Sequence, residues 1–141
     1  MNRSRPLRLV LDTNVFVSAV LFGGKPGRIL FGAREGNFRL LLSAPVLKEY
    51  VTVLAYPKFD LAAGDIRRLV REDLIPWSEP VQVATKVRFI PEDPSDDKFL
   101  ALAVDGKADM VISGDRHLLG AKMFRDIPIL SVDEFLTEPR R

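Results

Sequence analysis

The amino-acid sequence predicts an α/β domain of three layers, α/β/α, in which helices cover both faces of a central, mainly parallel sheet. Short runs rich in Leu, Val and Ile, which suit strands buried on both faces, alternate with segments whose apolar residues recur at helical spacing. Alternation of strands and helices is typical of such a sheet. The length of 141 residues fits a single domain, 1–141, and 47% apolar residues can supply its core.

The first predicted strand is Leu7–Leu11, an apolar run with little alternation. The Asp-Thr-Asn stretch at 12–14 offers side chains that can cap a helix over Val15–Phe22. Gly23–Gly27 is predicted to be a loop, and a second helix is predicted over Gly27–Arg34.

A second strand is predicted at Phe38–Leu42, and Ser43 after it is an N-cap candidate. The next helix runs to Leu54, because apolar side chains recur at helical spacing before Pro57. Gly64–Leu74 is predicted to be another amphipathic helix.

The second half of the chain begins with one or two short extended pieces between Trp77 and Ile90. Pro91–Ser95 is a predicted turn, and Ser95 can cap a helix that continues to about Lys107. The remaining predicted elements are strand Asp109–Ser113, helix Asp115–Leu119, strand Ile127–Leu130 and a last helical turn, Val132–Leu136.

Composition excludes several classes of site. The chain has no cysteine, which excludes disulfides, zinc–thiolate sites and cysteine nucleophiles, and His117 is its one histidine. The formal net charge of +2 and a sequence pI of about 9.1 are compatible with an anionic partner but decide little. The longest apolar stretch, Val15–Phe22, is far shorter than the roughly 20 residues of a membrane span. A soluble, cytoplasmic protein with no membrane partner is expected.

Two aspartates follow predicted strands. Asp12 comes directly after Leu7–Leu11, and Asp115 comes after Asp109–Ser113 and one glycine. In open α/β sheets ligands bind beyond the carboxyl ends of the strands, so both side chains are expected at one edge. Each also begins a predicted helix, where a carboxylate can simply be an N-cap. A single junction of this kind favours capping, whereas two in one small sheet favour a site.

Two further acids are candidates. On a helical projection, Lys98 and Asp105 define the exposed side of the predicted helix after Ser95, whereas Asp96 falls on the opposite, apolar side and Asp97 at its margin. A carboxylate facing inward is costly unless a cation meets it. Glu49 lies on one flank of the apolar stripe of its helix and, taken alone, is more typical of a solvated residue.

Carboxylates that converge on one site repel each other unless a cation neutralises them. An all-oxygen ligand set selects Mg²⁺ or Mn²⁺ rather than zinc. Such a site suits metal-assisted hydrolysis of a phosphodiester. Basic residues near it could hold nucleic-acid phosphates, although each is by default a solvated surface charge: Lys25, Arg28, Lys58, Lys98 and Arg116.

With the four acids Asp12, Glu49, Asp96 and Asp115 in this order, the sequence resembles the PIN-domain ribonucleases, and among them the toxins of toxin–antitoxin systems similar to VapC-type toxins. The matching stretches are LVLDTNVFVSAV, LLSAPVLKEYVTVLAYPKF and PEDPSDDKFLALAVDGKADMVISGD with the following RHLL, from residue 9 to about 119.

The resemblance implies a PIN-like fold and a metal-dependent endoribonuclease that hydrolyses RNA phosphodiester bonds with Mg²⁺ or Mn²⁺. It implies Asp12, Asp96 and Asp115 as metal ligands and Glu49 as the acid that completes the cluster and helps to orient or deprotonate water. The spacing within the family favours Asp96, with Asp97 as a possible substitute. Asn14 and Ser113 match neighbouring polar positions that steady the acids or a water molecule.

The same resemblance implies partners: an RNA substrate, a protein antitoxin that occupies the acidic groove, and a second copy of the chain in a homodimer or higher oligomer. Four aromatic residues could serve such an interface, although most of them are expected in the core: Phe22, Phe31, Phe59 and Trp77.

Three other functions fit parts of the sequence. A phosphatase with an aspartate nucleophile would carry a second acid two residues after Asp12, where this chain has Asn14. A Ser–His–Asp hydrolase would need His117 as its base, and no Gly-x-Ser-x-Gly elbow accompanies it. A catalytically silent domain that binds RNA or protein is the alternative from another class; a silent site would be free to lose the four acids.

Overall fold

The computed structural model describes residues 5–90 and 94–137 of the chain. Its strands are β1 (Leu7–Leu11), β2 (Phe38–Leu42), β3 (Ser78–Pro80), β4 (Met110–Ile112), β5 (Met123–Phe124) and β6 (Ile127–Leu130). Its α-helices are α1 (Thr13–Phe22), α2 (Gly24–Arg34), α3 (Ala44–Leu54), α4 (Ala63–Asp73), α5 (Asp97–Asp105), α6 (Arg116–Ala121) and α7 (Val132–Thr137), and short 3₁₀ turns are η1 (Pro57–Phe59), η2 (Ile75–Trp77) and η3 (Pro94–Asp96).

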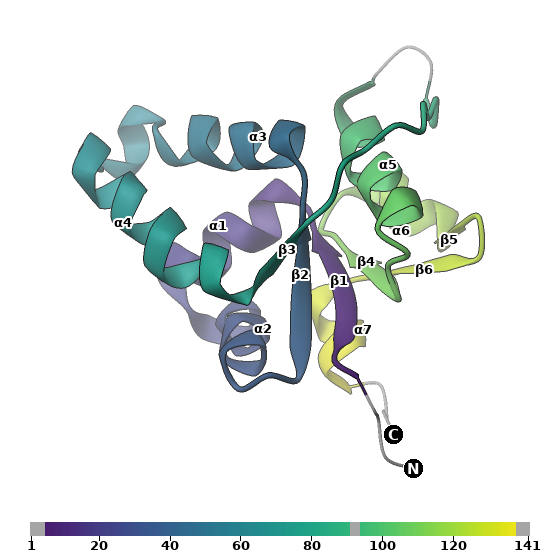
Figure 1. Ribbon diagram of the computed structural model, residues 1–141, viewed down its shortest axis with the longest axis horizontal. Helices are drawn as coiled ribbons and strands as arrows, with labels where there is room; N and C mark the ends of the chain where they lie inside the picture. Colours follow the sequence, from purple (N-terminus) through teal and green to yellow (C-terminus); the bar gives the residue numbers. More distant parts are fainter. Residues whose placement is uncertain (1–4, 91–93, 138–141) are drawn as a thin grey trace.

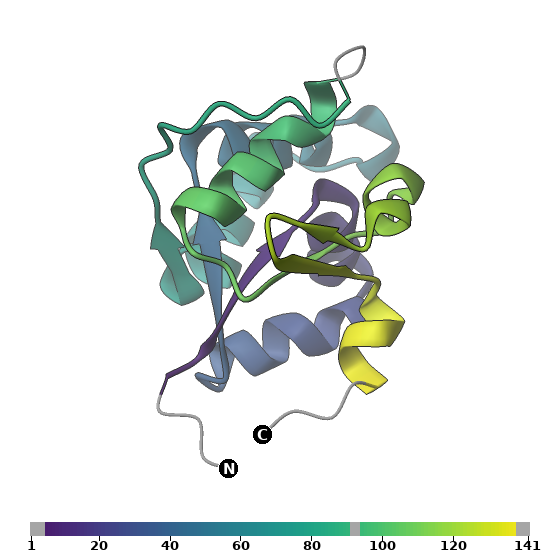
Figure 2. The same cartoon turned by 90° about the vertical axis from the view of Figure 1, so that its right-hand side faces the viewer.

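The strands form one sheet in the order β3-β2-β1-β4-β6-β5. All neighbouring pairs are parallel except β5 with β6. Figure 1 shows α1, α2 and α4 on one side of the sheet and α5 on the other, and in Figure 2 α5 crosses the face that is turned toward the viewer. The predicted three-layer α/β/α fold with a mainly parallel sheet is confirmed.

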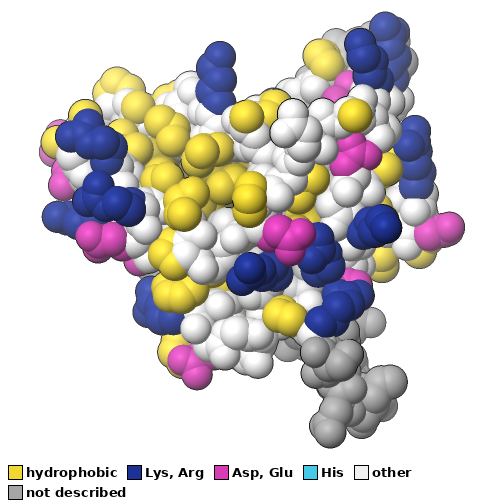
Figure 3. All heavy atoms as spheres, in the orientation of Figure 1, with side chains coloured by type: hydrophobic (Ala, Val, Ile, Leu, Met, Phe, Trp, Pro, Cys, Tyr) yellow, Lys and Arg dark blue, Asp and Glu magenta, His cyan; other side chains and the backbone are white. Residues whose placement is uncertain are grey.

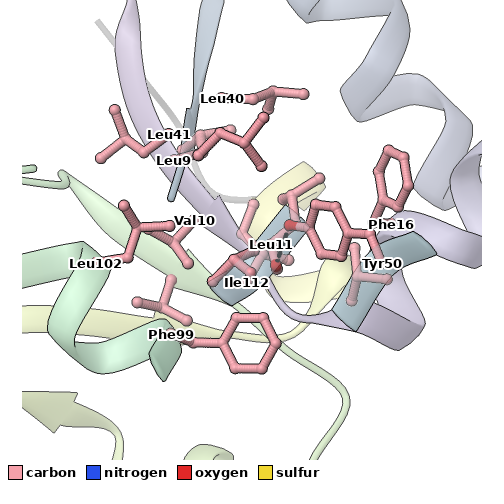
Figure 4. Close-up of a cluster of buried hydrophobic side chains, with 14 of the residues drawn as sticks. Leu9, Val10, Leu11, Phe16, Leu40, Leu41, Tyr50, Phe99, Leu102 and Ile112 are labelled. Atoms are coloured by element: carbon pink, nitrogen blue, oxygen red, sulfur yellow. Dashed lines mark hydrogen bonds between the residues drawn. The ribbon is translucent and has the colours of Figure 1, made fainter. Parts of the chain in front are cut away.

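The centre of the core is β1, which has a neighbouring strand on each side. Leu9, Val10 and Leu11 are each at most 2% exposed because both faces of this strand are covered. In Figure 4, Val10 lies beside Leu102 of α5, whereas Leu11 lies toward the stacked rings on the other face. The continuous apolar run in the sequence therefore matches a strand buried on both sides.

The topology fixes where a ligand site should lie. From β1 the chain moves outward through β2 to β3, and it then returns to place β4 on the other side of β1. The carboxyl ends of β1 and β4 therefore flank the point at which the strand order reverses, which is where open α/β sheets bind ligands. Asp12 directly follows β1, and Asp115 follows β4 through Ser113 and Gly114.

Three predicted helix boundaries, the start of α2 and both ends of α5, are wrong. The loop predicted over Gly23–Gly27 is reduced to Gly23, whose φ of 72° allows α1 to pass into α2 with a bend of 89°. Ser95 is not the cap of the later helix: Asp96 precedes its first residue, and the helix ends at Asp105 rather than near Lys107. The predicted turn at Pro91–Ser95 lies partly outside the described residues.

The segment after α4 contains less regular structure than an alternating pattern would give. Among the described residues of this segment, 74–90, only β3 pairs with the sheet, and the chain then runs past the end of α5. There the Asp105 carboxylate accepts hydrogen bonds from the backbone of Ala84 and Thr85 and from the Thr85 hydroxyl. These bonds lower the pKa of Asp105. Asp105 therefore holds this segment to the helix, which periodicity cannot show.

The aromatic residues expected in the core divide into two groups. Phe22 is 71% exposed and Phe31 is 60% exposed, so these two lie at the surface, and the expectation that most of the four lie in the core is wrong. Phe59 and Trp77 are partly buried against the core. Phe22 is the last residue of α1.

Among the described helices, none is by itself both long and apolar enough to span a membrane. Helices α1 and α2 are long and apolar enough only when they are taken together, and they are bent by 89° relative to each other. Each contributes a fully buried side chain to the core, Phe16 from α1 and Ile29 from α2.

The Arg8–Glu79 ion pair, which joins β1 to β3, gives stability that depends on pH. Nη1 and Nη2 of Arg8 donate to the Glu79 carboxylate, at 2.7 and 2.8 Å, and these bonds lower the pKa of Glu79. A carboxyl whose pKa is lowered on folding stabilises the fold above its ordinary pKa, and this contribution is lost as the pH falls through the lowered value.

We therefore expect wild type to be more stable than Glu79→Gln near neutral pH and the difference to shrink in acid, below the usual range of a glutamate. Urea unfolding of both proteins across a pH series measures this. Glu72→Gln, at an exposed glutamate of α4, is the matched control and should show no comparable trend. A Glu79→Gln difference of constant size across the series would contradict the prediction.

Candidate functional site

The four acids singled out in the sequence line one cavity of about 850 Å³: Asp12, Glu49, Asp96 and Asp115. They come from the end of β1, the middle of α3, the turn before α5 and the start of α6. In Figure 1 this part of the molecule lies at the top, between α3 and α5, and the space-filling outline in Figure 3 is hollowed there. The strand order, rather than proximity in sequence, brings these residues together.

Asp12 is the most buried of the four, with 6% exposure. Its Oδ1 accepts a hydrogen bond from the Val15 backbone at 2.9 Å, so it caps α1. Its Oδ2 accepts from the Ser113 hydroxyl at 2.5 Å and from the Gly114 backbone at 3.0 Å. Burial raises the pKa of Asp12, these donors oppose the rise, and the charge of Asp115 adds to it. Asp12 is thus both a helix cap and a carboxylate with a need for a nearby cation.

Asp115 is held in a similar way at the start of α6. Its Oδ1 accepts from the backbone of His117 and Leu118, at 2.8 and 3.1 Å. Its own backbone N–H donates to the Ser113 hydroxyl oxygen at 2.9 Å. Ser113 therefore links Asp12 and Asp115 through one hydroxyl group. Because that hydroxyl donates its proton to Asp12, Ser113 is a positioning group in this arrangement rather than a nucleophile.

Glu49 has partners that the sequence did not reveal. Thr13 donates its hydroxyl to Oε2 and Lys98 its ammonium to Oε1, each at 2.5 Å. The prediction that Lys98 lies on the exposed side of its helix is wrong: its side chain is 27% exposed and reaches across to α3. Helical periodicity describes one helix at a time, so it contained no signal for an ion pair between α3 and α5.

Asp96 and Asp97 are separated by the structure. Asp96 lines the acidic cavity, whereas Asp97 lines a different hollow and accepts a hydrogen bond from the Phe89 backbone at 3.1 Å. Of the two, Asp96 is therefore the one brought beside Asp12, Glu49 and Asp115. Asn14 also lines the cavity and is exposed.

Tyr50 supports the floor of the site without entering it. Its hydroxyl donates to the Leu11 carbonyl at 2.6 Å, one residue before Asp12, and its ring stacks on Phe16 with centroids 4.2 Å apart. Burial and the charges of Asp12 and Glu49 raise the pKa of Tyr50 well above its ordinary value. The hydroxyl therefore stays protonated and fixes the end of β1.

The cavity continues from its acidic end along an apolar wall formed by α1, the end of α3 and η1. The wall includes the exposed aromatic rings of Phe22 and Tyr56 and the partly buried Phe59. Figure 3 shows hydrophobic side chains gathered on the part of the surface that contains α3 and α4.

The predicted basic residues are distributed unevenly around the cavity. Lys58 lines it, and Lys98 reaches it through Glu49. Lys25 pairs with Asp133, Arg28 lines a separate hollow, and Arg116 is exposed beside Asp115.

The chemistry of these residues suits a divalent metal, although they do not form a preformed coordination site. Within residues 5–90 and 94–137, no three acids or histidines are gathered into a group that could hold a metal ion as they stand. The donor set nevertheless fits a hard cation, because four carboxylates line one cavity and the pKa of the most buried one is raised. Asp12, Asp96 and Asp115, with Glu49, are the residues that would hold it.

Comparison with known proteins agrees with this architecture. A family model described as PIN domain matches residues 8–117. The chain is 30% identical over 118 residues to the uncharacterized protein MJ1680 of Methanocaldococcus jannaschii, a match that covers 82% of this chain and 76% of that protein. The crystal structure of PAE2754 from Pyrobaculum aerophilum superimposes with a TM-score of 0.59 at 14% identity, over 93% of this chain and 87% of that one.

Proposed function

Because this chain belongs to the PIN-domain family, whose members are generally nucleases that use divalent metals, we propose that it is an endoribonuclease dependent on Mg²⁺ or Mn²⁺. One observation carries the proposal: four acids that are far apart in the sequence line a single cavity at the reversal point of the sheet. The proposed reaction is hydrolysis of an RNA phosphodiester bond by water.

The chain's own residues have distinct parts in this reaction. Asp12, Asp96 and Asp115 supply carboxylate oxygens at the acidic end of the cavity, where Ser113 and the backbone of α1 and α6 fix two of them. A bound Mg²⁺ or Mn²⁺ would supply charge neutralisation at the phosphate and activation of water. Glu49, held by Thr13 and Lys98, would accept a hydrogen bond from the attacking water and orient it.

The test compares two neighbouring carboxylates. Purified wild type is expected to cleave a mixed RNA pool with Mg²⁺ or Mn²⁺ and to lose this activity in EDTA. Asp96→Asn removes a charge from the acidic cavity and should reduce cleavage about a hundredfold or more. Asp97→Asn is the matched control, because Asp97 lies outside that cavity and an amide oxygen can still accept from Phe89.

Gel electrophoresis of a labelled RNA pool measures the rates. Equal cleavage by wild type and Asp96→Asn would contradict the assigned site. No cleavage by wild type with either ion would refute the enzyme proposal and favour a silent binding domain.

As part of the same proposal, the chain is the toxin of a type II toxin–antitoxin pair. The acidic cavity with its apolar wall is complementary to a basic, amphipathic segment of an antitoxin. The exposed rings of Phe22 and Phe31 are available for contact with such a partner or with a second copy of the chain. A small open reading frame directly adjacent to the gene, encoding a protein that binds this chain, is the observation that tests this role.

A further inference from the structure

A second hollow, of about 510 Å³, adjoins the acidic cavity. Glu49, Val53 and Tyr56 line both spaces, so this stretch of α3 and the residues after it form the wall between them. Lys48 and Lys98 line the second hollow but not the acidic cavity, as do Pro45 and Thr52.

The two neighbouring spaces carry opposite charge. The acidic cavity is lined by four carboxylates, whereas the second hollow presents two ammonium groups and only the shared Glu49. Lys98 is fixed by Glu49 and by the Ser95 carbonyl, at 2.5 and 3.1 Å. Lys48 is exposed and forms no ion pair with any residue of the described ranges. Its charge is therefore available to an anion from outside the chain.

Tyr56 stands at the boundary of the two spaces with 46% of its surface exposed. An exposed aromatic ring beside a cationic hollow is the combination with which proteins bind single-stranded nucleic acids, because bases stack on the ring while cations meet the phosphates. A base-paired helix would not present its bases to such a ring.

We infer that the second hollow binds the nucleotide next to the scissile phosphate of a single-stranded RNA, with its phosphate on Lys48 and its base on Tyr56. This inference rests on the proposed function, since the scissile phosphate is assigned to the acidic cavity. The strand would pass over Tyr56 from one space to the other, and Lys98 would contribute charge to the hollow while it holds Glu49.

The test measures binding apart from cleavage. Fluorescence anisotropy of a labelled, single-stranded oligouridylate is recorded with the full chain in EDTA over a range of salt concentrations. Lys48→Gln should weaken binding about fivefold and reduce the slope of log affinity against log salt by about 0.7, the loss of one phosphate contact. Lys107→Gln, an exposed lysine between α5 and β4 at the opposite edge of the sheet, is the matched control.

Substitutions of Tyr56 test the base contact. Tyr56→Leu should weaken binding by at least about fivefold with little change in the salt slope, and Tyr56→Phe should bind as wild type does. Equal affinity and slope for Lys48→Gln and Lys107→Gln would overturn the phosphate contact. Wild-type binding by Tyr56→Leu, or equal weakening by Tyr56→Phe, would overturn the stacking contact.

The outcome of this experiment is separable from that of the cleavage experiment. If wild type cleaves RNA with metal and the Lys48 and Tyr56 substitutions do not change binding, the proposed function stands and the second hollow is refuted as a subsite. If binding depends on both residues but no metal ion supports cleavage, RNA binding at the second hollow stands and the proposed nuclease activity is refuted.

Discussion

Asp12→Asn is expected to reduce metal-dependent RNA cleavage about a hundredfold to a thousandfold while the protein stays folded. The substitution removes the charge of the most buried acid in the cavity. The variant amide oxygen can still accept from the Val15 backbone, so the cap of α1 is retained. The other end of the side chain changes from an acceptor to a donor beside Ser113 and Gly114.

The substitution is therefore expected to lower catalytic activity much more than stability. The Ser113 hydroxyl can turn to accept from the new amide, but the Gly114 N–H cannot, which leaves one unfavourable contact. We expect a small change in the thermal midpoint and a large change in rate. Asp133→Asn, which removes a carboxylate from the exposed Lys25–Asp133 pair between α2 and α7, should leave the rate unchanged.

Rates on the same RNA pool, with circular dichroism melts of each variant, measure the two effects separately. An Asp12→Asn protein that melts normally and cleaves at the wild-type rate would show that Asp12 is only a helix cap.

Phe16→Ala is expected to lower the free energy of unfolding by about 3–5 kcal/mol. Phe16 is completely buried, and its ring stacks on Tyr50 at an interplanar angle of 15°. Removal of the ring leaves a cavity beside Tyr50, whose hydroxyl fixes the Leu11 carbonyl at the end of β1. Since whole domains are stable by only about 5–15 kcal/mol, a large part of the total would be lost.

Phe22→Ala on the same helix is the matched control. Its side chain is 71% exposed, so the substitution should change stability by only about 0.5 kcal/mol. Urea unfolding followed by circular dichroism measures both variants. Similar midpoints for the two variants would contradict the assignment of Phe16 to the core.

The parts of the fold that could be predicted are those in which local sequence determines local structure. β1, β2 and β6 have the predicted bounds because their apolar runs are bounded by polar residues or proline. Asp12 and Asp115 could be placed at one edge because the carboxyl ends of parallel strands share an edge. The two-residue strand β5 was missed because such a short stretch has no measurable periodicity.

What could not be predicted depends on contacts between elements. Lys98 meets Glu49 only because α5 packs beside α3. Tyr50 reaches the Leu11 carbonyl only because α3 lies over the end of β1. Neither pair has a pattern in the linear sequence, and both partners lie on elements whose relative placement follows from the strand order.

The residues of the acidic cavity are far apart along the chain, and this separation has a consequence for protein synthesis. The Ser113 hydroxyl that holds Asp12 lies 101 positions later in the sequence. A growing or prematurely ended chain that stops just before β4 carries Asp12, Glu49 and Asp96 but lacks Ser113 and Asp115. The proposed nuclease would therefore stay inactive while its own ribosome translates the message, and would become active only after most of the domain has been made.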